Sequence, residues 1–263
     1  MKRTFFILIL STLFLSCASQ TPLTVVKQEE PLKTVRFNAL ENFFDVCEKD
    51  FSKVNEVINR KNLVKNLTHL QLMNSGGSKY YLLERENISE MIKAVTKGLY
   101  SDIILINPAG TIIYTMTEQA LFSKNATLGL PDSPYPLCFS KSIAGAIHVE
   151  DLTNYPRYSN NIDMYISSPV RKEGVITAVM IFKVSLERIE QLVNSKTRII
   201  GKDGLYRIAE KRESALHPYP HFSRINSSCL NGMKKDSFRV ESREYSCIPY
   251  QYRNLYWIII SER

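Results

Sequence analysis

The spacing of hydrophobic residues along the chain changes several times, and each change predicts a different element. After Asn38, which forms a capping-box pattern with Glu41, apolar residues recur at helical spacing. The members of this stripe are Leu40, Phe43, Phe44, Cys47, Phe51, Val54 and Ile58. We therefore expect one long amphipathic helix over 36–74, ended by a loop at 75–78. The stripe either packs on its own domain, which is the commoner use, or forms a homodimer interface through the N-terminal helix.

A second helix and a hairpin are expected next. Asn87 and Glu90 repeat the capping pattern, and the apolar residues that follow share one helical face. The period then becomes that of strands. Residues 102–107 and 111–117 are rich in isoleucine and threonine, and the Asn-Pro-Ala-Gly between them suits a tight turn. The mixed segment 118–143 predicts a loop with short helices lying across a sheet.

The stretch 147–193 concentrates the candidate chemistry. It predicts a polar, aromatic-rich loop, two strands joined by the turn 171–174, and a helix that begins at Ser185. Within eight residues the loop carries Asp151, Asn154, Tyr155, Arg157 and Tyr158. Such a density of hydrogen-bonding and stacking groups suits a small-molecule pocket better than a surface connection.

Composition adds an export signal to this picture. A hydrophobic content of 44% is ample for a packed core. Two basic residues precede the mostly apolar run 5–15, which is shorter than the about 20 residues that span a bilayer, so the segment is typical of a secretory signal. Its end, Ser16 and Cys17, resembles the lipobox of bacterial lipoproteins, although Phe14 stands where leucine is usual.

The lipobox resemblance implies a signal peptide over 1–16, a membrane lipid attached to Cys17 and a flexible tether over 17–35. The tether is polar, contains two prolines and lacks a hydrophobic period. The alternative is an ordinary signal peptide with an incidental cysteine. In both cases the mature chain is expected in the cell envelope, either periplasmic or on the outer face.

Export changes how the four remaining cysteines are weighed, because disulfides persist outside the cytoplasm. Cys229 and Cys247 lie in one short C-terminal segment and are the expected disulfide pair. The alternative is buried free thiols. No Cys/His ligand spacing occurs, and the prolines between His217 and His221 prevent a helix that would bring both to one face, so we expect no metal site.

Charge and motifs narrow the function classes. The formal net charge of +8 is spread along the chain, without the basic stripe and interleaved aromatics of nucleic-acid-binding proteins. We therefore expect no nucleic-acid partner. A weak attraction to anionic lipid headgroups fits the charge better, and ordinary solvated surface charge is the default interpretation. The sequence contains no P-loop, Gly-x-Ser-x-Gly or His-Glu-x-x-His motif. We expect neither catalysis nor a cofactor.

Four segments together resemble the extracytoplasmic double Cache sensor domain of bacterial chemoreceptors, sensor kinases and cyclases. They are SDIILINPAGTIIYT, VEDLTNYPRYS, MYISSPVRKEGVITAVMIFKVSLERI and RIIGKDGLYRI. The resemblance covers roughly 36–263 and implies an α+β fold, in which a long N-terminal helix is followed by two PAS-like modules with antiparallel sheets. A membrane-distal module, 75–195, would hold the ligand pocket, and a smaller membrane-proximal module, 196–263, would follow. Because the sequence ends at Arg263 without a signalling domain, we expect a separate membrane signalling or transport partner.

The resemblance also implies ligand-binding residues. Tyr155, Arg157 and Tyr158 fall where amino-acid-binding members place an arginine and aromatics around a carboxylate, and Tyr165 falls on the next strand. Asp151, in the same loop, completes the candidate set. An arginine can hold a carboxylate through two charge-assisted hydrogen bonds. The alternative is a structural loop whose tyrosines pack on the sheet edge.

Lys183 departs from the family pattern. It stands at the strand position where amino-acid-binding members carry an aspartate for the ligand's ammonium. By strand alternation it shares a face with Val179 and Ile181, which is the pocket face if this alignment is right. A lysine there would repel an ammonium and favour a small anionic ligand, such as a carboxylate. The alternative is that Lys183, near the strand end, extends to solvent.

Two functions from different classes are therefore compatible with the sequence. The first is a ligand-binding sensor or solute-binding lipoprotein that takes a small anionic or polar metabolite. The second is a structural or interaction lipoprotein whose pocket has collapsed. Arg157, Tyr165 and Lys183 discriminate between them, because a filled pocket should replace such polar groups with aliphatic ones.

Overall fold

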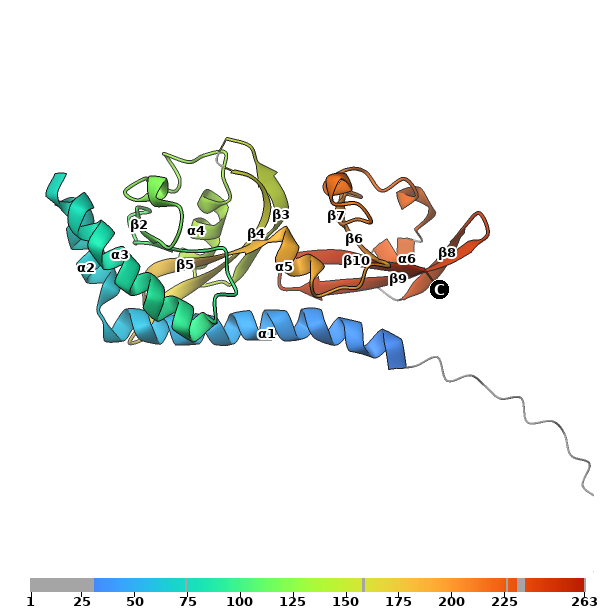
Figure 1. The fold of residues 1–263 in the computed structure, drawn as a ribbon, viewed down its shortest axis with the longest axis horizontal. Coiled ribbons are helices and arrows are strands. Elements are labelled where there is room, and N and C mark those ends of the chain that lie inside the picture. The colour runs from blue at the N-terminus through green and yellow to red at the C-terminus, as the bar shows by residue number, and fades with distance from the viewer. Residues whose placement is uncertain (1–30, 74, 158, 226, 231–234, 263) are drawn as a thin grey trace, which may run out of the picture.

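The computed structural model describes residues 31–73, 75–157, 159–225, 227–230 and 235–262. Within them the chain forms two antiparallel five-stranded sheets, and one long helix lies along both (Figure 1). The expected α+β class, with a long N-terminal helix and two PAS-like modules, is confirmed. The expected signal peptide, Cys17 and Tyr158 lie outside the described residues.

Three helices open the described chain: α1 (Pro31–Arg60), α2 (Leu63–Leu72) and α3 (Ser75–Thr96). The helix expected over 36–74 is therefore broken, because Asn62 takes a left-handed backbone conformation with φ of 51°. Helix α1 also begins inside the expected tether, at Pro31, a residue that suits the first helical position.

The expectation of a loop at 75–78 and a second helix from Asn87 was wrong, because α3 already begins at Ser75. Tertiary packing supports this extra length. Tyr81 of α3 is buried, stacks on Phe122 with ring centroids 3.6 Å apart, and exchanges hydrogen bonds with the backbone of Thr115. Such contacts override the low helix propensity of the two glycines in the first turn.

We call the sheet formed within residues 102–185 the distal sheet, and its strand order is β2-β1-β5-β4-β3. Its strands are β1 (Asp102–Ile106), β2 (Ile112–Thr115), β3 (His148–Tyr155), β4 (Ser159–Lys172) and β5 (Val175–Ser185). The expected hairpin at 102–117 is confirmed by the antiparallel pairing of β1 with β2. Between β2 and β3 lie a short 3-10 helix, η1 (Gln119–Leu121), and α4 (Tyr135–Ile143).

The polar stretch expected as a loop near 147–158 is largely strand β3, which pairs with β4 at the edge of the sheet. Buried Val149 and Leu152 anchor it, while the polar residues between them occupy half-buried positions. The density of polar side chains arises because an edge strand is only partly covered. In the sequence, this density of polar residues therefore did not distinguish an edge strand from a loop.

The two faces of the distal sheet pack against different elements. Ile103, Met180 and Phe182 belong to the core shared with α1 to α3, where Phe182 stacks on Phe51 at 4.1 Å. Ile104 and Ile181 belong to a second core on the opposite face, under α4 and the segment before it. Successive side chains of β5 therefore point into two different cores. One face of the sheet packs against α1 to α3, and the other packs against α4.

We call the second sheet, formed within residues 197–262, the proximal sheet, and its strand order is β7-β6-β10-β9-β8. Helix α5 (Leu186–Glu190) leads into β6 (Thr197–Gly201), β7 (Tyr206–Ile208), β8 (Asp236–Val240), β9 (Arg243–Tyr252) and β10 (Leu255–Glu262). The segment between β7 and β8 contains η2 (Arg212–Ser214), η3 (Phe222–Arg224) and α6 (Ser227–Leu230). Cys229 of α6 and Cys247 of β9 form a disulfide, as the sequence suggested.

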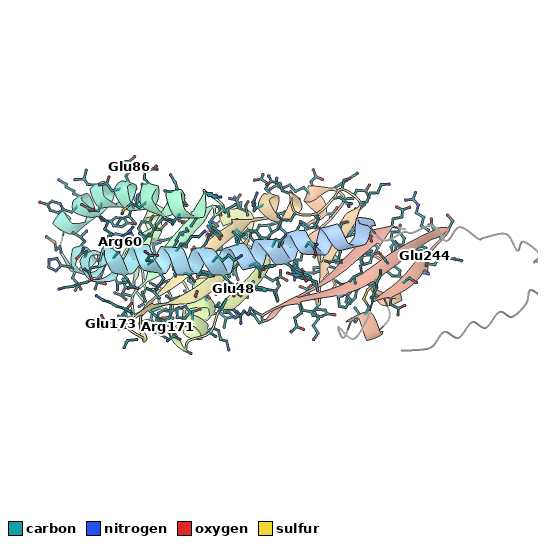
Figure 2. The ribbon with its side chains drawn as sticks, turned by 90° about the horizontal axis from the view of Figure 1, so that it is seen from below. Glu48, Arg60, Glu86, Arg171, Glu173 and Glu244 are labelled. Atoms are coloured by element: carbon teal, nitrogen blue, oxygen red, sulfur yellow. A yellow bond between two sulfur atoms is a disulfide. The ribbon has the colours of Figure 1, made fainter. Side chains whose placement is uncertain are left out.

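The apolar stripe of helix α1 is buried within the molecule. Figure 2 shows it lying lengthwise across both sheets. Near its N-terminal half, Phe44 stacks on Tyr252 at 4.1 Å, and Glu48 accepts hydrogen bonds from Tyr252 and Arg253. The stripe that could have been a homodimer interface is therefore covered by the molecule's own sheets. Among the described residues, every helix is too short or too polar to cross a membrane.

Candidate functional site

A buried lysine lies near the end of β5, the central strand of the distal sheet. Lys183 of β5 pairs with Asp102 of β1 on one side and with Tyr165 of β4 on the other. Its side chain emerges on the face of Val179 and Ile181, under α4, as strand alternation predicted. It does not extend to solvent, because only 5% of the side chain is exposed.

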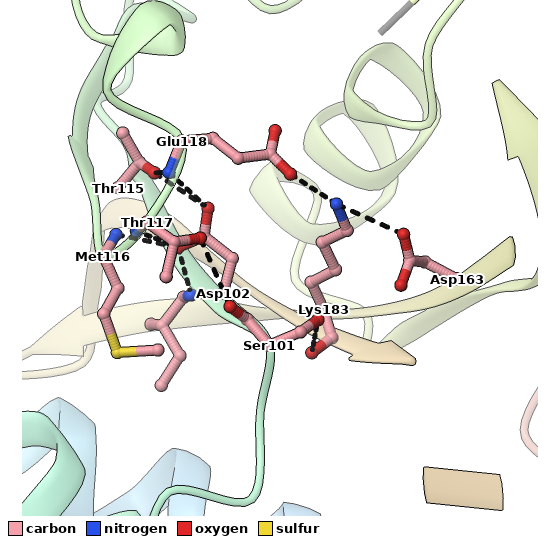
Figure 3. A network of polar contacts seen from close by, with 9 residues as sticks. Ser101, Asp102, Thr115, Met116, Thr117, Glu118, Asp163 and Lys183 are labelled. Carbon is pink, nitrogen blue, oxygen red and sulfur yellow. Dashed lines mark hydrogen bonds and ion pairs between the residues drawn. The ribbon is translucent and has the colours of Figure 1, made fainter. Parts of the chain in front are cut away.

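Two carboxylates hold the Lys183 ammonium (Figure 3). Nζ forms an ion pair with Glu118, in the segment after β2, and lies 3.2 Å from Oδ2 of Asp163 on β4. The Asp163 side chain is 2% exposed, whereas that of Glu118 is 27% exposed. Burial opposes the charged lysine, but both carboxylates outweigh it, so the pKa of Lys183 is raised. We call Glu118, Asp163 and Lys183 the ionic cluster.

Asp102 fixes the segment that carries Glu118. Its buried carboxylate accepts hydrogen bonds from the backbone N–H groups of Ile103, Met116, Thr117 and Glu118 and from the hydroxyl of Thr115. This carboxylate therefore holds the backbone of Glu118 in the segment after β2 (Figure 3). The Glu118 side chain is 27% exposed. Hydrogen bonds to Asp102 thus hold the backbone at Glu118, and the carboxylate of Glu118 is the most exposed group of the ionic cluster.

Tyr165, next to Lys183, packs against two further tyrosines. Tyr165 is buried and meets Tyr135 of α4 and Tyr155 of β3 edge to face, with ring centroids 5.9 Å and 6.1 Å away. Lys183 Nζ lies 5.9 Å from the Tyr165 ring centroid, within cation–π range. Burial raises the pKa of all three phenols above their ordinary value, so they are neutral hydrogen-bonding groups at physiological pH.

The other expected ligand residues have different partners. Arg157 is exposed and forms an ion pair with Asp132, in the segment before α4. Asp151 accepts hydrogen bonds from Arg207 and Trp257 of the proximal module, at 2.7 Å and 2.8 Å. Of the six expected residues, the structure gathers Tyr155, Tyr165 and Lys183 in one place. The ligand roles of all six stay predictions.

Glu118, Asp163 and Asp102 were not predicted from the sequence. Asp163 is two residues before Tyr165 on the same strand, so the alternation that placed Lys183 could also have placed it on the pocket face. Glu118 lies 65 residues from Lys183 and belongs to a segment without periodicity. No sequence signal identifies it. Among the described residues, no group of three or more histidine, cysteine or acidic side chains is arranged to hold a metal ion.

Comparisons with known proteins rest on structure alone, since no family model and no curated protein sequence matches the chain. The sensory domain of the Campylobacter jejuni chemoreceptor Tlp3 is similar to it, with a TM-score of 0.56, 14% identity, and coverage of 88% of this chain and 89% of that one. The sensor domain of the V. cholerae histidine kinase DctB gives a TM-score of 0.54 and 16% identity, covering 88% and 95%.

An extracellular ligand-binding receptor from Desulfohalobium retbaense is also similar, with a TM-score of 0.59 and 9% identity. The match covers 86% of this chain but only 38% of that receptor, so it concerns one part of a longer protein. At these identities the likeness is one of fold. Two antiparallel sheets joined along one helix, matched over almost the full length of two sensor domains, give this chain the double Cache fold of ligand-binding sensor domains.

Proposed function

We propose that this chain is a non-catalytic, extracytoplasmic small-molecule-binding domain whose ligand meets the ionic cluster on the distal sheet. The observation that carries the proposal is the buried lysine between two carboxylates. Buried ion pairs add little net stability, because desolvation offsets their attraction. A core built only for stability would hold apolar residues at these positions. Perturbed, buried ionisable groups beside aromatic walls are instead typical of binding sites.

A small anion, such as a carboxylate, is the ligand class that the cluster favours by exchange. Asp163 is buried on a strand, but the Glu118 side chain is partly exposed and only its backbone is fixed. A ligand carboxylate can therefore replace that of Glu118 at Lys183. The exchange leaves no buried charge unpaired, because one carboxylate leaves as another arrives. Glu118 then turns to solvent.

A thermal-shift and calorimetry screen tests this function with carboxylates, amino acids and amines as probes. A ligand at a hundred times its Kd should stabilise the fold by about 2.7 kcal/mol. Lys183→Met should abolish binding of the carboxylate, and Glu118→Gln should strengthen it, because a competing anion is removed. Lys196→Met, at an exposed position, is the matched control.

The screen also separates the ligand class from the function itself. Tight binding of amines with no response to carboxylates would reject the anionic ligand and retain a binding domain. In that case Glu118→Gln should weaken binding, since two carboxylates and the tyrosines would hold the cation. The two signs of the Glu118→Gln effect therefore distinguish the ligand charges.

The close packing between the distal sheet and α4 favours a second candidate, a structural or interaction module with a collapsed pocket. Tyr135, Tyr165 and Ile181 are almost completely buried between the sheet and α4. No response across the whole library, together with unchanged stability when Glu118 is replaced, would support this reading over ligand binding.

We also propose that the chain is anchored by a lipid on Cys17 and acts through a separate membrane partner. The lipobox-like end of the N-terminal segment supports the anchor, and the sensor fold supports the partner. Metabolic labelling with an alkyne fatty acid tests the anchor. The wild-type chain should be labelled, and a Cys17→Ser chain should not be.

A further inference from the structure

Exposed apolar side chains gather at one end of the molecule. Of the eight large hydrophobic side chains that the described residues leave exposed, five lie between positions 72 and 83. They are Leu72, Met73, Tyr80, Leu82 and Leu83. The most exposed, Leu72 and Leu83, are 72% and 70% accessible. Scattered apolar side chains are ordinary on a protein surface, but a contiguous group marks an interaction site.

A groove runs beside these side chains, between α2 and α3. It encloses about 730 Å³, and the buried side chains of Leu63, Leu67 and Ile88 form its apolar floor. One lip carries Lys65 on α2, and the other carries Glu84 on α3. We call the groove and the five exposed residues the α2–α3 surface. It has an apolar ridge, an apolar groove, and one charge of each sign.

The position of this surface leaves it open to another molecule. Helices α2 and α3 form the end of the molecule that is remote from the start of α1 and from the C-terminus (Figure 1). The stripe of α1 is buried against both sheets, so it is not available for assembly. Of the large apolar side chains that the described helices expose, all but Leu137 of α4 belong to the α2–α3 surface.

We propose that the α2–α3 surface is the contact between two copies of this chain. A two-fold symmetric contact uses the same surface on both copies, so that surface must complement itself. With the two-fold axis parallel to the groove, the Lys65 lip of one copy faces the Glu84 lip of the other. Tyr80 and Leu83, on α3 of each copy, then pack against α2 of its partner, where Leu72 is exposed.

The pairing of Lys65 with Glu84 selects a second copy over an unrelated partner. Each copy supplies one basic and one acidic lip, and the symmetric contact matches both pairs at once. A lipid surface would favour basic residues alone around the apolar side chains. The apolar ridge supplies the binding energy, while the charges fix the orientation of the two copies.

Sedimentation velocity of the full chain over a range of concentrations tests the contact. The wild type should form a dimer. Leu83→Glu should weaken the dimer by at least about tenfold, because it places a charge in the apolar contact. Leu128→Glu is the matched control, since Leu128 is 86% exposed on a different segment, and it should leave the dimer unchanged. Both substitutions are on the surface, so the melting temperature should report an intact fold.

Charge reversal tests the orientation. Lys65→Glu and Glu84→Lys should each weaken the dimer, and the double variant should restore it, because the exchanged charges again face each other. A monomer at every concentration would overturn the proposal. So would a dimer that Leu83→Glu leaves intact, or binding of anionic vesicles that depends on Leu83 in a chain that stays monomeric.

Discussion

Arg207 donates a hydrogen bond from its Nε to the carboxylate of Asp151 at 2.7 Å, and this contact joins the two modules. Asp151 lies on β3, at the edge of the distal sheet, and Arg207 lies on β7, at the edge of the proximal sheet. Trp257 of β10 donates to the same carboxylate. Asn254 adds two hydrogen bonds to the backbone of Val149 on β3. Strand β3 therefore belongs to the distal sheet and contacts the proximal module through its side chains and its backbone.

Replacing Asp151 with alanine should destabilise the protein by about 2–3 kcal/mol, because the buried guanidinium of Arg207 keeps only Asp203 as a carboxylate partner and the buried indole N–H of Trp257 loses its acceptor. Urea unfolding followed by circular dichroism measures the change. Arg212→Ala is the control: its ion pair with Glu187 is exposed on both sides and should contribute less than about 1 kcal/mol. Equal losses for the two variants would contradict the importance of the buried contact.

Glu48 should make stability depend on pH in the acid range. Burial raises its pKa, but hydrogen bonds from Arg253 and Tyr252 outweigh burial and lower it below the ordinary value of 4.5. The contribution of Glu48 is therefore present above pH 4.5 and is lost as the pH falls through the lowered pKa. Glu48→Gln should be less stable than wild type at pH 7, and the difference should shrink toward pH 3. Glu86→Gln, on the exposed side of α3 (Figure 2), should give no such trend.

The fold was largely predictable because its signals are local. The stripe from Leu40 to Ile58 and the isoleucine-rich hairpin at 102–117 each carry a clear period, and both elements are present. The errors occurred where tertiary contacts decide. The packing of Tyr81 against β2 stabilises helix α3 in spite of the two glycines in its first turn. The edge position of β3 gives this strand the polar composition of a loop.

The candidate site was predictable only where it follows from alternation along a strand. The period of β5 placed Lys183 on the correct face. Its partner Glu118 comes from an irregular segment, and only the folded chain brings the two together. Asp151 and Arg157 are close to Tyr155 in sequence. However, one bonds to the proximal module and the other to Asp132, because neighbours on a strand or turn point in different directions.

Removing the disulfide should cost stability without exposing reactive thiols. Cys229 and Cys247 close a loop with a sequence separation of 18, and loss of such a bridge should lower the unfolding free energy by about 2–4 kcal/mol. A Cys229→Ser/Cys247→Ser variant measures this in urea. Burial raises the pKa of Cys47 to about 12 and that of Cys138 further, so neither thiol should react with an aromatic disulfide reagent in the folded variant. Rapid labelling of Cys47 or Cys138 under native conditions would contradict this arrangement.

Lys183 should control stability at both ends of the pH range. At pH 7, Lys183→Met should lower the unfolding free energy by about 2–4 kcal/mol, because Asp163 and Glu118 lose their cation. The raised pKa of Lys183 means that its contribution is complete below the ordinary value of 10.5 and is lost as the pH rises through the folded-state value. The gap between wild type and Lys183→Met should therefore be constant from pH 7 to 10 and then close.

Acid should close the same gap from the other side. Without the ammonium, burial favours the protonated form of Asp163, so the variant should gain stability relative to wild type as the pH falls toward 4. Thermal unfolding of both proteins from pH 4 to 11.5 gives the whole profile, and the triple variant Glu118→Gln/Asp163→Asn/Lys183→Met should give a flat one. A gap that does not change with pH would mean that the variant acts through lost packing alone, and that the ionic cluster is not the charged site described above.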